Sequence, residues 1–155
     1  MASSKNITPL NPQLPTLSND HSRAGQLYGS AQGLLLAKAA QQYDGPLLVI
    51  TDDTATAQRL ELEARFYLGS EDVLPILHFP DWETLPYDTF SPHQDIVSER
   101  LATLHKLPSF KRGILFVPIA TIMHRLAPRE FLDGNTLILK IGDRVDIASW
   151  RRKLE

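Results

Sequence analysis

The 155-residue chain contains no cysteine. Disulfides, cysteine zinc sites and thiol nucleophiles are therefore excluded, and the composition fits a reducing compartment. With 16 Lys and Arg against 18 Asp and Glu, the formal net charge of −2 gives no bulk attraction to nucleic acid or anionic lipid. No apolar run approaches the roughly 20 residues of a membrane helix, and the polar start has no apolar signal core. We expect a soluble cytoplasmic protein without membrane contact.

A working phosphate loop is also missing. The segment Gly29-Ser30-Ala31-Gln32-Gly33 opens an apolar helical pattern, where such a loop would lie. The functional motif needs Gly-x4-Gly-Lys-Ser/Thr, because the lysine contacts phosphates and the hydroxyl binds magnesium. With Gln32 at the lysine position, none of the required residues is present. We predict a helix-start turn without nucleotide hydrolysis or bound cofactor; residual phosphate binding by backbone amides is the alternative.

The sequence predicts no metal and no catalytic residue. Acids and histidines gather in one region, comprising His78, Asp81, Asp88, His93, Asp95 and Glu99. Their spacing matches no metal motif such as His-Glu-x-x-His, so we interpret them as solvated or helix-capping groups. Hydrolytic chemistry is not predicted either, because a Gly-x-Ser-x-Gly elbow does not occur.

Short aliphatic runs alternate with helical patterns. The expected strands are Leu47–Ile50, buried on both faces, Val73–Leu77, placed at a sheet edge by its proline, and Gly113–Val117. A first helix is expected to start near position 18 or 20, and a second covers 34–40. A third helix is expected between a cap at 51–53 and a terminal Gly69. A fourth begins at a capping box formed by Ser91 and Gln94, and a short fifth helix lies around 121–126. This rhythm predicts an α/β fold, with a parallel sheet and helices on both faces.

Three regions are expected along the chain. Residues 1–17 form an irregular arm, and 18–132 form the α/β domain. Residues 133–155 form the beginning of a second, α+β domain. There Leu137, Leu139 and Ile141 alternate with polar residues, and an amphipathic helix begins at Asp146.

Residues 79–95 combine aromatic rings, prolines and acids in one connection. Large rings on a connection indicate either packing or binding. We expect Trp82, Tyr87 and Phe90 to pack as a small cluster under the connection, with a partner or DNA interface as the alternative.

Weak DNA contact is a second hypothesis. The candidate cations flank the third strand and are Lys111, Arg112, Arg125 and Arg129. Aromatic rings beside such cations suit base stacking, but Asp81, Glu83 and Asp88 surround the rings and oppose phosphate. A solvated surface is the simpler interpretation.

Residues 79–95, which we call the aromatic segment, and several neighbouring stretches resemble a known family. The stretches Asp81–Asp88, Phe90–Ile96, Ser98-x-Arg100-Leu101 and Arg112–Pro118 look like the N-terminal region of bacterial transcription-repair coupling factors. The resemblance runs from about Leu27 to the end of the chain. It implies a UvrB-like, helicase-like domain 1A over 18–132, with a degenerate phosphate loop, and the start of domain 2 over 133–155.

The resemblance also implies a function for the parent protein. Coupling factors displace RNA polymerase stalled at DNA lesions and recruit nucleotide excision repair through UvrA, which binds domain 2. Their ATP- and magnesium-dependent translocase motor, and their contacts with RNA polymerase and DNA, lie in other domains. We therefore expect a non-catalytic module that supports the UvrA-binding domain. The alternatives are a DNA-binding module and, third, a residual nucleotide-binding domain.

Overall fold

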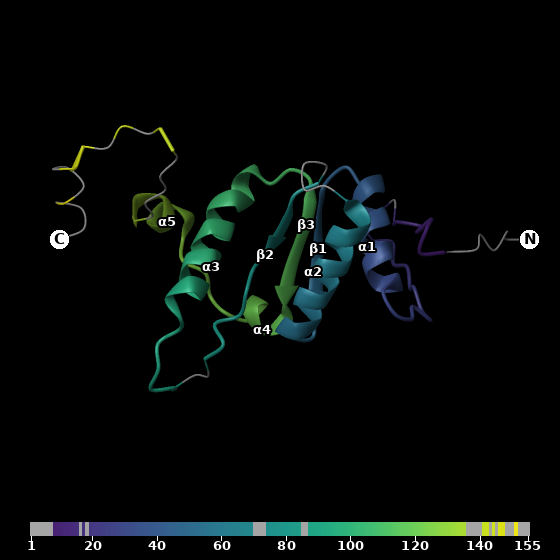
Figure 1. Ribbon diagram of the computed structural model, residues 1–155, viewed down its shortest axis with the longest axis horizontal. Coiled ribbons are helices and arrows are strands. Elements are labelled where there is room, and N and C mark those ends of the chain that lie inside the picture. Colours follow the sequence, from purple (N-terminus) through teal and green to yellow (C-terminus); the bar gives the residue numbers. More distant parts are fainter. Residues whose placement is uncertain are drawn as a thin grey trace, which may run out of the picture.

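The computed structural model describes residues 8–15, 17, 19–69, 74–84, 87–135, 141–142, 144, 146–147 and 151. Within them the chain forms an α/β fold around a three-stranded sheet (Figure 1). The elements are α1 (Ala31–Gln42), β1 (Pro46–Thr51), α2 (Thr54–Leu68), β2 (Ile76–His78), α3 (Gln94–Lys106), the 3-10 turn η1 (Leu107–Ser109), β3 (Gly113–Pro118), α4 (Ile119–Ile122) and α5 (Arg129–Asn135). No helix in these residues is both long and apolar enough to cross a membrane.

The sheet is parallel, with strand order β1-β3-β2. The last strand in the sequence therefore lies in the centre, where Leu115 pairs with Leu48 on one side and Leu77 on the other. Ile114 and Phe116 of β3 are fully buried. The predicted α/β class and parallel sheet are confirmed. β2 lies at an edge, as expected, but it begins at Ile76 and not at Val73, so Pro75 precedes the strand.

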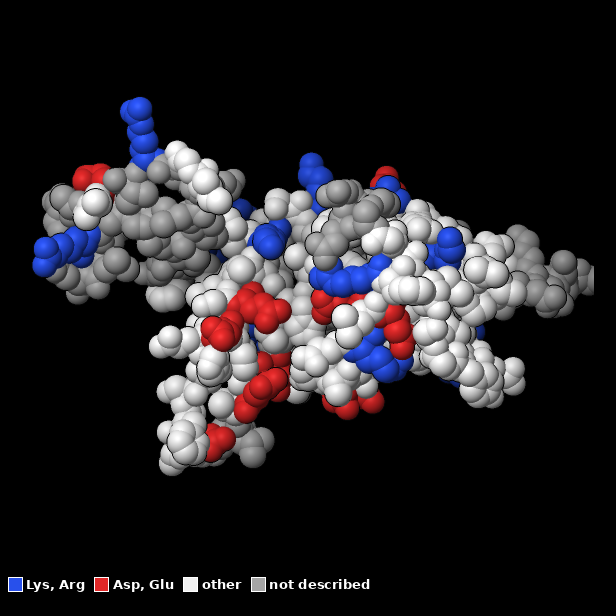
Figure 2. All heavy atoms as spheres, in the orientation of Figure 1, with Lys and Arg blue, Asp and Glu red and all other residues white. Residues whose placement is uncertain are grey.

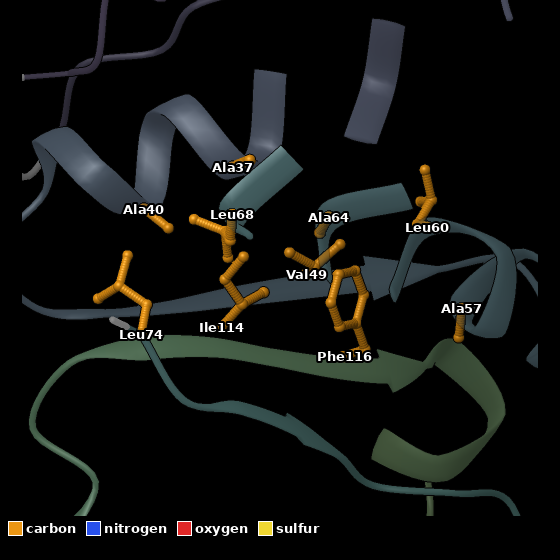
Figure 3. Packing of buried hydrophobic residues seen from close by; sticks show 10 residues of the cluster. All are labelled: Ala37, Ala40, Val49, Ala57, Leu60, Ala64, Leu68, Leu74, Ile114 and Phe116. Atoms are coloured by element: carbon orange, nitrogen blue, oxygen red, sulfur yellow. The ribbon is translucent and has the colours of Figure 1, made fainter. Parts of the chain in front are cut away.

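The helices enclose the sheet from two sides. α1 and α2 pack together over the face that carries Val49, Ile114 and Phe116, and the buried side chains of both helices form the core together with these residues (Figure 3). α2 links β1 to β2, while α3 returns from β2 to β3 in the opposite direction across the sheet. Right-handed crossovers then place α3 on the other face. In Figure 1 the strands lie between α3 and the α1–α2 pair.

One expectation about β1 is wrong. The strand was expected to be buried on both faces, yet Leu48 is 54% exposed and Ile50 is 52% exposed. β1 is an edge strand, and α1 and α2 cover only the face on which Val49 lies. The aliphatic run therefore predicted the strand correctly but not its surroundings.

Local sequence signals predicted both ends of α2 correctly but the start of α3 wrongly. Asp53 caps α2 by accepting the Thr56 amide at 2.7 Å, and Gly69 ends it with φ of 84°, as predicted. The capping box at Ser91 is wrong, because α3 begins at Gln94. Instead the extended His93 provides the cap, and its Nδ1 accepts the Asp95 amide at 3.3 Å.

Other expected helices change or fall outside the described residues. Residues 19–28 contain no helix, so the start near position 18 or 20 is wrong; α1 begins only at Ala31, after positive φ angles at Gln26 and Gly29. The helix expected around 121–126 is the single turn α4. The alternation at 137–141 and the helix from Asp146 lie largely outside the described residues, so the second domain stays a prediction.

A polar network links α2 to β2. The Glu61 carboxylate accepts from Arg65 at 2.8 Å through one oxygen, and its other oxygen lies 3.1 Å from His78 Nδ1. The hydrogen bond with His78, followed by the bonds with Arg65, lowers the pKa of Glu61 below the ordinary 4.5, against the effect of burial. The network therefore stabilises the folded state only while Glu61 is ionised.

A pH titration of stability tests this network. Because the folded pKa of Glu61 is depressed, its contribution is complete above about pH 4.5 and is lost as pH falls toward the lower folded value. We expect Glu61→Gln to remove part of the acid dependence of the unfolding free energy, measured by urea denaturation at several pH values. Glu99→Gln, on the exposed side of α3, is the control. Equal changes in both variants would contradict the assignment.

Candidate functional site

The amino end of α1 contains the segment Gly29–Gly33, which the sequence predicts to be a degenerate phosphate loop. Ser30 is the N-cap residue but makes no side-chain cap bond; its hydroxyl lies 2.6 Å from the Tyr67 hydroxyl. The Gly33 amide, in the first turn, donates to Glu63 Oε2 of α2 at 3.2 Å. The Glu63 carboxylate therefore accepts the hydrogen bond that this amide could otherwise donate to a phosphate oxygen.

Two further contacts hold that carboxylate in place. Arg59 Nη1 lies 2.8 Å from Glu63 Oε1, and Arg59 Nη2 donates to Gln32 Oε1 at 3.0 Å. Gln32, which stands at the lysine position of the motif, is thus engaged by α2. These two contacts place the positive charge of Arg59 beside residues 29–33, where it is already paired with the Glu63 carboxylate.

Gly33 makes the close approach of the two helices feasible. A Cβ atom built at Gly33 would lie 2.2 Å from Glu63 Cβ, far inside van der Waals contact. The same packing surface contains the small residues Ala37, Ala40, Ala57 and Ala64, all almost completely buried. Gly33 is therefore a packing residue of this structure, placed where the motif would have its hydroxyl.

Replacing Gly33 by alanine shows whether packing or helix propensity has the larger effect on the unfolding free energy. An alanine in an exposed helix would stabilise it by about 1 kcal/mol relative to glycine. Here we expect overpacking to dominate, so that Gly33→Ala lowers the unfolding free energy by about 1–3 kcal/mol. Gly25→Ala, outside the helices, is the control for an alanine substitution without overpacking, because no atom lies within 4 Å of its Cβ position. Thermal denaturation of both variants measures this, and a stabilised Gly33→Ala variant would refute the close contact.

The aromatic segment begins at a buried cation. Arg100 of α3 is 2% exposed, and its guanidinium lies 4.2 Å from the Phe79 ring centroid and 4.0 Å from that of Trp82. It also donates to the Pro80 carbonyl at 2.5 Å. Burial lowers the pKa of Arg100, while the charge of nearby Asp81 opposes that change. Arg100 therefore fastens the start of the connection to α3 through its planar face and its N–H groups.

The three predicted aromatic residues lie in different surroundings. Trp82 is half-buried against Arg100, whereas Tyr87 is fully exposed and Phe90 is 77% exposed. Tyr87 has φ of 72° and Glu83 has φ of 56°, which non-glycine residues adopt only rarely. The structure therefore brings Trp82 to the core side and leaves the other two rings facing solvent. Arg100 was missed as a functional residue, although its spacing places it on the same helix face as Val97, Leu101 and Leu104.

Replacing Arg100 by lysine tests the stacking. Lysine keeps the charge but cannot stack a planar group on two rings, and its ammonium is more strongly hydrated. We expect Arg100→Lys to cost about 1–3 kcal/mol of unfolding free energy, measured by urea denaturation. Arg125→Lys, at an exposed position, should leave stability unchanged. A fully stable Arg100→Lys variant would show that charge alone suffices.

The carboxyl ends of β2 and β3 meet at Asp81. Its Oδ1 accepts from Thr121 at 3.4 Å and lies 3.8 Å from His124 Nε2. Ligands of open α/β sheets bind at this edge. However, the Thr121 hydroxyl points to the acid and not to the histidine, and Thr121 is 1% exposed, so the trio does not form an activated nucleophile.

The candidate metal ligands are dispersed. His78 pairs with Glu61, and His93 lies 3.3 Å from Asp95 at the start of α3. Among the described residues, no group of three or more His, Asp or Glu side chains is arranged to hold a metal ion.

The candidate DNA-contacting cations do not form one patch. Lys111 and Arg112 precede β3 and line an open pocket of about 560 Å³ together with Lys106 and Arg65. Arg112 also donates to the Gln41 carbonyl at 2.8 Å. The remaining two cations lie beyond the other end of β3: Arg125 follows α4, and Arg129 begins α5.

The described residues form an open parallel α/β domain in which Glu63 accepts a hydrogen bond from the Gly33 amide in the first turn of α1. The chain is homologous to transcription-repair-coupling factors. It is 44% identical to that of Haemophilus influenzae over 144 residues and 40% identical to that of Escherichia coli K12 over 142 residues. These matches cover 93% and 92% of the chain but 12% of each relative. The predicted resemblance is confirmed, and the chain corresponds to a short part of these relatives. No protein-family model matches it.

Proposed function

We propose that the chain is a non-catalytic module of a transcription-repair-coupling factor. The parent protein would displace RNA polymerase stalled at DNA lesions and recruit the UvrA-containing excision repair machinery. This segment would act as the scaffold beside the UvrA-binding domain, without hydrolysing nucleotide. ATP and magnesium would act in a motor domain elsewhere in the parent.

One observation carries the non-catalytic part of the proposal. Glu63 accepts the Gly33 amide at 3.2 Å and pairs with Arg59, so the helix end presents a carboxylate where a nucleotide phosphate would bind. A second negative charge at the same amide would be repelled. The lysine that would neutralise the β- and γ-phosphates is replaced by Gln32, whose amide oxygen accepts from Arg59. The homology supports the role in repair.

The scaffold role predicts a difference between two lengths of the protein. UvrA binding should be measured by surface plasmon resonance for this chain and for one extended through domain 2. We expect strong binding only by the extended chain, because most of the contacting surface would lie in domain 2, of which residues 133–155 would form the beginning. Equal binding by both would contradict this placement of the interface.

DNA binding is the second candidate, and one pocket favours it. Lys106, Lys111 and Arg112 gather with Arg65 around the open pocket near the amino ends of the strands. Such a cluster suits phosphate oxygens. Against it, Arg65 is bonded to Glu61 and Arg112 to a carbonyl, so half of these cations are engaged within the protein.

Titration with duplex DNA across salt concentrations distinguishes this candidate. Contacts to phosphates should make the affinity fall steeply with salt, with a slope of roughly −0.9 per neutralised phosphate. If the pocket binds DNA, Lys106→Ala with Lys111→Ala should reduce the slope by about 2. Arg125→Ala, at the other end of β3, serves as the comparison and should leave the slope unchanged. Absent or salt-independent binding would eliminate this candidate.

A further inference from the structure

The aromatic segment forms a projection from the body of the domain. After Trp82 the chain runs away from the sheet and returns at the start of α3 (Figure 1). Tyr87 and Phe90 lie on this projection with their rings in solvent. We define the projection surface by Glu83, Tyr87, Asp88 and Phe90. Neighbouring exposed rings that form one apolar surface are a candidate interaction site.

Both ends of the projection are fixed. On one side Arg100 holds Phe79 and Trp82 by stacking and Pro80 by a hydrogen bond. On the other side the His93 cap begins α3. A surface mounted on fixed ends loses less conformational entropy on binding than a free loop.

The backbone of the projection is strained. Glu83 and Tyr87 have positive φ angles of 56° and 72°, which cost of order 1 kcal/mol or more for residues with a Cβ. At Tyr87 the ring gains no buried contact in return, since it is fully exposed. Backbone strain of this kind is typical of functional sites, so we expect the Tyr87 ring to be covered in a bound state.

The charge around the rings selects the partner. Between Trp82 and the start of α3 at Gln94 the sequence contains the acids Glu83 and Asp88 and no lysine or arginine, and the exposed Asp95 and Glu99 follow in α3. Figure 2 shows acidic atoms along the projection at the lower left and on the adjoining surface. A nucleic acid phosphate backbone would be repelled here, whereas lysine and arginine side chains would be attracted.

We propose that the projection surface docks into a protein partner that has an apolar pocket rimmed by lysine and arginine. Tyr87 and Phe90 would fill the pocket, and Glu83 and Asp88 would pair with its rim. Buried aromatic anchors surrounded by polar contacts are typical of the residues that dominate protein interfaces. This binding surface is separate from the scaffold role, so either proposal can fail without the other.

Labelled synthetic probes test the chemistry directly. The 155-residue chain is titrated by fluorescence anisotropy with peptides of about 15 residues in four compositions: leucine with lysine, leucine with glutamine, leucine with glutamate, and lysine with glycine and serine. A single-stranded DNA of similar length is the fifth probe. We expect the leucine–lysine peptide to bind at least about tenfold more tightly than any other probe.

Variants then locate the binding. Tyr87→Ala with Phe90→Ala should weaken binding of the leucine–lysine peptide at least about tenfold, and Glu83→Gln with Asp88→Asn should weaken it and reduce its salt dependence. Tyr28→Ala with Phe66→Ala removes two equally exposed rings elsewhere and should have no effect. Unchanged circular dichroism and melting temperature confirm that each variant folds.

Several results would overturn the proposal. These are binding that does not depend on peptide charge, binding unaffected by loss of the two rings, tighter binding of the DNA through those rings, or no binding of any probe. Sedimentation that shows a dimer of this chain abolished by the ring substitutions would overturn it as well, because the occupant would then be a second copy.

Discussion

The close packing of α1 on α2 is the constraint on which most of this structure depends. Gly33 and the buried alanines Ala37, Ala40, Ala57 and Ala64 bring the two helices together over one face of the sheet. The same approach carries the Glu63 carboxylate to the Gly33 amide. The core and the closed phosphate-loop position therefore have one cause, since a side chain at position 33 would both separate the helices and move the acid away.

Arg100 has the corresponding role on the other side of the sheet. Its guanidinium lies between Phe79 and Trp82, so the chain leaving β2 is attached to α3 before the projection begins. The domain thus combines a filled helix terminus, which opposes nucleotide binding, with a fixed projection of exposed rings and acids, which favours protein contact.

The sequence predicted those features that depend on short-range patterns. The aliphatic runs located β1 and β3, and Asp53 and Gly69 bounded α2. Features that depend on tertiary neighbours were not predictable. The exposed side of β1 follows from the strand order, and Glu63 reaches Gly33 across 30 positions of sequence.

For the candidate site, too, the sequence predicted some features and not others. Failure of the phosphate motif was visible from Gln32 alone, but the residue that fills the position was not. The aromatic segment was recognisable as unusual, yet no pattern separated half-buried Trp82 from exposed Tyr87 and Phe90. Their surroundings depend on Arg100 and on positive φ angles that local propensity does not favour.

The most direct measurement of the central claim is a calorimetric titration of the chain with ATP and magnesium, with a working P-loop ATPase as the positive control. Because the Gly33 amide is bonded to Glu63 and the Gln32 side chain to Arg59, we expect no saturable heat of binding for this chain. Saturable binding of ATP would contradict the account, since it would show that the amino end of α1 remains open to phosphate.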